Sequence, residues 1–76
     1  MSKWTRDSRF DYYMNDDYPN IIIRPDLGGG YNKWEVIRVV PAWREDVAAR
    51  KVRSVDVLSR HRLIADAKRY VSLREN

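Results

Sequence analysis

The sequence predicts a small α+β protein in which a C-terminal amphipathic helix packs on a small antiparallel sheet, giving two layers. Two β-branched runs flank a glycine-rich stretch, which is typical of a β-hairpin. A shorter alternating segment follows and indicates a probable third strand, and the C-terminal segment carries apolar residues at helical spacing. A helix laid on one sheet face is the simplest arrangement that buries both apolar surfaces.

A chain of 76 residues is expected to form one domain, 1–76. We divide it into an aromatic-rich N-terminal segment (1–19), a β-sheet region (20–57) and a C-terminal helix (59–74). The N-terminal segment holds five of the nine aromatic residues, and disordered tails are poor in aromatics, so we expect it to pack on something. Phe10, Tyr13 and Met14 share i, i+3, i+4 spacing, which predicts a short helical turn around 7–14.

The β-hairpin is predicted from Ile21-Ile22-Ile23 and from residues 33–40. Pro25 to Gly30 lie between these runs and supply the backbone freedom that a reversal needs. A triple glycine also occurs in phosphate-binding loops, but those loops lead directly into a helix. Here strand-like residues follow, so a flexible hairpin tip is the better interpretation.

The second strand is apolar on both faces. Trp34, Val36 and Val40 point to one side, while Ile37 and Val39 point to the other, where Ile22 joins them from the first strand. One helix covers one face only. We therefore expect the N-terminal segment, a partner protein or a second copy of the chain to cover the face that carries Ile22, Ile37 and Val39.

Residues 42–50 allow either a helical turn or a long loop, because Trp43 and Val47 are four residues apart. Residues 51–57 alternate well enough for the third strand, and Ser59 offers an N-cap for a helix that starts immediately after it. The expected helix stripe is Leu63, Ile64, Ala67, Tyr70 and Val71. The predicted core consists of Ile21, Ile23, Trp34, Val36, Val40, Leu63, Ile64 and Val71.

The amino-acid composition limits the kinds of functional site that the chain can form. The chain has no cysteine and His61 is its only histidine, which excludes disulfides and leaves little basis for structural zinc or for nucleophilic catalysis. We expect no enzyme activity, no metal and no cofactor. No stretch has the roughly 18 apolar residues of a membrane span, so we expect a cytoplasmic protein without membrane contact.

The formal net charge is +4, and the basic excess belongs to residues 41–76, where nine Lys/Arg face five Asp/Glu. The leading hypothesis is a non-catalytic protein that docks on a protein partner, as phage or mobile-element accessory and inhibitor proteins do. Trp, Tyr and Arg dominate interface hot spots. The predicted partner-binding residues are Trp4, Phe10, Tyr12, Tyr13, Trp43, Arg44, Arg50 and Arg53. The alternative is nucleic-acid binding by the basic face of the C-terminal helix, through Arg60, Arg62, Lys68 and Arg69.

Overall fold

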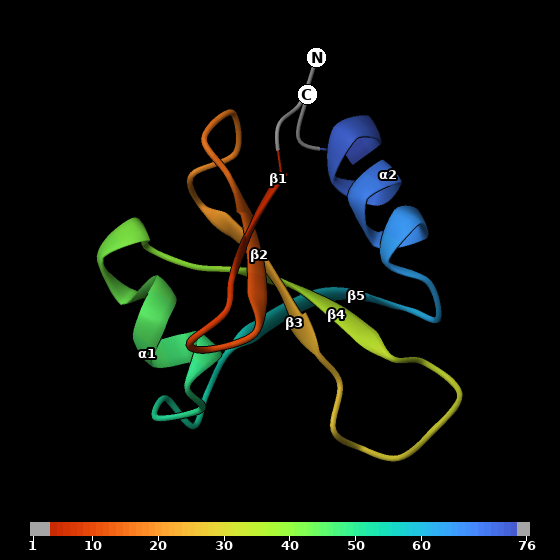
Figure 1. The fold of residues 1–76 in the computed structure, drawn as a ribbon, viewed down its shortest axis with the longest axis horizontal. Helices are drawn as coiled ribbons and strands as arrows, with labels where there is room; N and C mark the ends of the chain where they lie inside the picture. The colour runs from red at the N-terminus through yellow and green to blue at the C-terminus, as the bar shows by residue number, and fades with distance from the viewer. Residues whose placement is uncertain (1–3, 75–76) are drawn as a thin grey trace.

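A computed structural model describes residues 4–74 as a five-stranded antiparallel sheet in the order β1-β2-β3-β4-β5, with two helices (Figure 1). The predicted α+β class is confirmed, with five strands in place of three. Helices α1 and α2 lie on opposite sides of the sheet (Figure 1). The elements are β1 (Trp4–Asp7), β2 (Tyr12–Asn15), β3 (Ile21–Pro25), β4 (Trp34–Arg38), the 3-10 turn η1 (Pro41–Trp43), α1 (Arg44–Ala48), β5 (Asp56–His61) and α2 (Ile64–Arg74).

The N-terminal segment is a β-hairpin, so the prediction of a helical turn over 7–14 is wrong. Strands β1 and β2 pair from Trp4 opposite Asn15 to Asp7 opposite Tyr12. The Asp7 carboxylate accepts a hydrogen bond from the Arg9 backbone N–H at 2.9 Å, and Asp11 adopts a positive φ of 53°, a conformation that Asp tolerates. The turn hydrogen bond and the β1–β2 pairing therefore replace the helical turn that the apolar spacing suggested.

The central hairpin is confirmed, with Ile22 opposite Ile37 and Pro25 opposite Trp34 at the end that carries its loop. Residues 26–33 form its loop, and Gly29 has a φ of +74°, which L side chains rarely adopt. A strand follows the glycines, as the sequence predicts, so this loop has no helix N-terminus with which to hold a phosphate.

The third predicted strand and the C-terminal helix both begin later than expected. Strand β5 starts at Asp56 and not at 51, and helix α2 starts at Ile64 and not after Ser59. Ser59 lies in β5 opposite Val36, so it is not a helix cap. Pairing with β4 therefore overrides the local helical pattern around residues 59–63.

The prediction of a two-sided apolar sheet is confirmed by two separate hydrophobic clusters. Ile22, Ile37 and Val39 are buried on the α1 side together with Tyr12, Val47 and Ala48. Ile21, Ile23 and Val36 are buried on the α2 side against Ala67 and Val71. The chain thus covers both faces itself. Helix α2 covers one face, and α1 with the β1–β2 hairpin covers the other. The assignment of Val40 and Leu63 to the core is wrong, because both side chains are exposed.

Tyr12 provides a pH test of this packing. Burial raises the pKa of its phenol above the ordinary value of about 10, and the nearby Asp7 and Glu45 carboxylates act in the same direction. Because the folded state favours the neutral phenol, this contribution to stability is complete below about pH 10 and is lost as the pH rises through the raised value. We expect one tyrosine to ionise late in an alkaline absorbance titration, and Tyr12→Phe to remove that step. A titration unchanged in Tyr12→Phe would contradict this placement.

Candidate functional site

A buried ion pair lies on the α1 side of the central hairpin. Arg24 Nε donates to Glu35 Oε1 at 2.6 Å, and Arg24 Nη1 donates to the Val47 carbonyl at 2.7 Å. Arg24 and Glu35 are only 7% and 5% exposed. The guanidinium therefore ties α1 to the sheet, because it bonds a carboxylate on β4 and a backbone carbonyl on α1 at once.

Two further arginines approach the same carboxylate. Arg60 Nε lies 3.6 Å from Glu35 Oε2 and 3.5 Å from Asp26 Oδ2, and Arg50 Nη1 lies 3.8 Å from Glu35 Oε1. Arg50 also donates to the Pro25 carbonyl. Burial lowers the pKa of Arg50, and repulsion from Arg24 lowers it further. The arginine cluster, defined as Arg24, Arg50 and Arg60 with Asp26 and Glu35, therefore contains more cations than carboxylates.

A β-bulge places Arg60 in this cluster. Val57 pairs with Ile37, and Val36, the residue before Ile37, pairs with Ser59 and not with Leu58. Leu58 is therefore the extra residue in β5. One additional residue reverses the alternation of side chains along the rest of the strand. Arg60 consequently lies opposite Glu35, on the side of the sheet away from α2.

The 40–43 surface, defined as Val40, Pro41, Ala42 and Trp43, is a run of four consecutive exposed apolar residues at the other end of β4. Val40 is 62% exposed and Trp43 is 54% exposed. Pro41 opens η1, and the Trp43 N–H donates to the Val40 carbonyl at 2.8 Å, which holds the four residues in one compact turn. A fixed turn presents an apolar surface at a low entropic cost of ordering.

An open cavity of about 380 Å³ adjoins this surface. Arg38 and Asp56, which are opposite one another in the β4–β5 pairing, stand in its wall. A smaller cavity of about 180 Å³ lies beside it and includes Asp17. The lining of the larger cavity is Asn20, Arg38, Val39, Val40, Pro41 and Asp56. Asn20 lines both cavities, so apolar and acidic groups adjoin at this end of the molecule.

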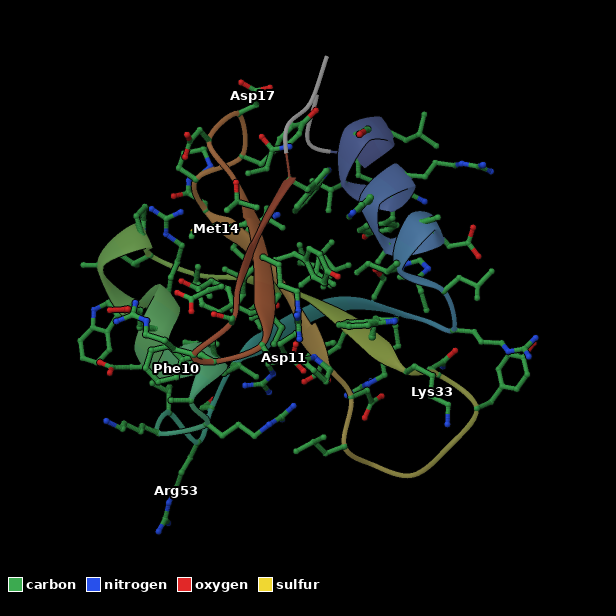
Figure 2. The ribbon with its side chains drawn as sticks, in the orientation of Figure 1. Phe10, Asp11, Met14, Asp17, Lys33 and Arg53 are labelled. Atoms are coloured by element: carbon green, nitrogen blue, oxygen red, sulfur yellow. The ribbon has the colours of Figure 1, made fainter. Side chains whose placement is uncertain are left out.

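The predicted partner-binding residues are distributed over both sides of the sheet. Trp4 and Tyr13 pack on the α2 side, Phe10 packs beside the α1 cluster, and Tyr12 is 2% exposed in the core. Figure 2 shows Arg53 projecting away from the rest of the molecule. Trp43 keeps a large exposed area, and the neighbouring Arg44 contacts the Pro41 carbonyl at 3.4 Å and the Met14 sulfur at 3.6 Å. The structure thus brings only Trp43 and Arg44 of this set to the 40–43 surface.

The predicted nucleic-acid residues are also separated. Arg60 belongs to β5 and to the arginine cluster, so its assignment to the C-terminal helix is wrong. Arg62 precedes α2, and its guanidinium lies 5.2 Å from the centre of the Tyr31 ring. Lys68 is half-buried with its Nζ 4.8 Å from the centre of the Tyr13 ring. Arg69 alone of the four is an exposed residue of α2.

Sequence reasoning missed one polar pair, Ser59 and His61. Their side chains are 2.7 Å apart, and the imidazole packs 5.4 Å from the Tyr70 ring. Side chains that are two positions apart on a strand point to the same face. The alternation of a strand over these residues was therefore the signal that could have identified the pair. Within residues 4–74 no carboxylate bonds the imidazole to orient it, as a nucleophile–base pair requires.

Across the described 4–74 segment, no three His, Cys, Asp or Glu side chains gather where they could hold a metal ion. Neither described helix has the length and apolar character to cross a bilayer.

Comparison of the chain with protein-family models, curated proteins and solved structures found no match. The 40–43 surface, the arginine cluster and the loop beside it are therefore the features of the molecule that indicate a function.

Proposed function

We propose that this protein is a non-catalytic binding protein that docks on another protein through the 40–43 surface. The observation that carries the proposal is the run of four exposed apolar residues next to a cavity. Contiguous exposed apolar residues rimmed by polar groups are typical of protein-interaction sites, and Trp leads the residues that contribute most to interface affinity. A small accessory or inhibitor protein of a phage or mobile element would act in this way.

The partner's chemistry follows from the groups around the cavity. Among residues 4–74, the lining of the two cavities includes the carboxylates Asp17 and Asp56 and the cation Arg38, and Asp16 is exposed on the adjoining turn. We expect the partner to insert an apolar side chain over Val40 and Trp43 and to place basic residues against the aspartates. Complementary charges of this kind accelerate association and exclude wrong partners.

The test uses affinity capture from the native host with matched variants. Val40→Asp and Trp43→Ala should each remove the captured protein, because a truncated hot spot costs about 2 kcal/mol or more of binding free energy. Leu73→Asp is the control, since Leu73 is an exposed apolar residue on α2, away from the 40–43 surface. A capture that survives both variants, or is lost only in Leu73→Asp, would refute the proposed surface. Size-exclusion chromatography tests whether the protein forms a homodimer through this surface. Self-association that Val40→Asp abolishes would show that the occupant is a second copy of the chain.

A further inference from the structure

A second surface lies at the opposite end of β4, where the 26–33 loop meets the end of β5. The Asp26 N–H donates to the Lys33 carbonyl at 2.8 Å, and the Lys33 N–H donates to the His61 carbonyl at 2.9 Å. These backbone bonds fix the base of the loop against β5. Lys33 and Arg62 consequently lie at the same end of the β4–β5 pair as Arg60.

Positive charge accumulates at this corner. The arginine cluster already has three cations around two carboxylates. Lys33 and Arg62 add two more, and neither contacts a carboxylate within residues 4–74: Lys33 Nζ lies 3.5 Å from the Gly30 carbonyl, and Arg62 Nη1 lies 3.5 Å from the Tyr31 hydroxyl. Such a local excess of cations stabilises bound anions, and phosphate suits the planar guanidinium fork.

The same loop exposes an aromatic ring. Tyr31 is 73% exposed, and the Arg62 guanidinium lies 5.2 Å from its ring centre. Leu27, also on this loop, is exposed as well. A half-exposed arginine, Arg60, completes the loop surface, which we define as Leu27, Tyr31, Lys33, Arg60 and Arg62. Exposed aromatics between basic groups are the arrangement on which single-stranded bases stack.

We infer that the loop surface binds single-stranded nucleic acid, with Tyr31 stacking on an unpaired base while Lys33, Arg60 and Arg62 contact phosphates. A duplex presents no free base face to Tyr31, and an acidic peptide offers the arginines a carboxylate but gives the ring no base. This surface is separate from the 40–43 surface. Protein docking and nucleic-acid binding can therefore be tested independently.

The test is a titration of the full chain into a fluorescent oligothymidylate at salt concentrations from about 50 to about 200 mM. Tyr31→Ala should weaken binding about tenfold without changing the salt dependence, because it removes a stacking contact and no charge. Arg62→Ala and Lys33→Ala should each reduce the slope of log affinity against log salt by about 0.7, the value for one phosphate on a single strand. All three residues are exposed or nearly so, so the fold should tolerate these changes, which circular dichroism checks.

Arg74→Ala is the matched control, because Arg74 also lies over a tyrosine, at 5.6 Å from the Tyr70 ring centre, but on α2. It should leave affinity and slope unchanged, as should Arg69→Ala on the outer face of the helix. Failure of the oligonucleotide to bind at low salt would overturn the inference. So would losses confined to Arg69→Ala, which would move the site to the helix, or binding of a duplex or of polyglutamate that is as tight as that of the oligonucleotide.

Discussion

Removing residues 1–18 should prevent this protein from folding. The deletion takes away β1 and β2, exposes the edge of β3, and removes Tyr12 from the cluster that contains Ile22 and Ile37. Each fully buried large side chain contributes about 1.5–3 kcal/mol, and a domain of this size is stable by only about 4–11 kcal/mol. We expect the truncated chain to lose near-ultraviolet circular dichroism and cooperative thermal unfolding.

A point variant makes the same prediction testable in the full chain. Tyr12→Ala should lower the free energy of unfolding by about 3 kcal/mol, because the cavity that it creates lies between β2 and α1. Tyr31→Ala is the matched control: the chemical change is identical, but Tyr31 is exposed, so the loss should stay within about 0.5 kcal/mol. A truncated chain that unfolds cooperatively at the temperature of the full chain would show that the N-terminal hairpin is dispensable.

The central hairpin and its two apolar faces could be predicted from the sequence because the determining information is local. The β-branched residues of Ile21–Pro25 and Trp34–Arg38 favour strands, and the intervening glycines favour a reversal. Period-two alternation then assigns each residue to a face, and burial of Ile22 and Ile37 agrees with that assignment. What the sequence left open was the cover of the second face, which α1 and the first hairpin supply.

The errors occur where strand pairing competes with a local pattern. Phe10, Tyr13 and Met14 fit a helical stripe, yet Tyr13 pairs with Ile23 in the sheet. The apolar residues after Ser59 fit a helix, but the pairing with β4 continues to His61. A single-residue bulge has no sequence signature here, so the side to which Arg60 points was not predictable. The arginine cluster follows from that bulge, whereas the assignment of Arg60 to the helix followed from the helical pattern after Ser59.

Glu35→Gln should destabilise the protein by about 3–5 kcal/mol. Glutamine keeps the shape of the side chain but removes the charge that compensates Arg24, whose side chain is 9% exposed. Arg50 and Arg60 lose the same counter-charge, so repulsion within the arginine cluster increases. Chemical denaturation of the two proteins measures the difference, and a reduced midpoint with an unchanged slope would show a loss of stability.

An exposed glutamate–arginine pair provides the comparison with the buried one. Glu45 also pairs with an arginine, Arg9, but their side chains are 52% and 68% exposed. Glu45→Gln should therefore cost far less stability than Glu35→Gln, because water screens an exposed pair. Equal losses in the two variants would mean that Glu35 contributes through packing and not through charge. The double variant Arg24→Met, Glu35→Leu tests the same point, because it also removes the buried charge of Arg24 that Glu35→Gln leaves without a counter-charge, and it should recover much of the loss.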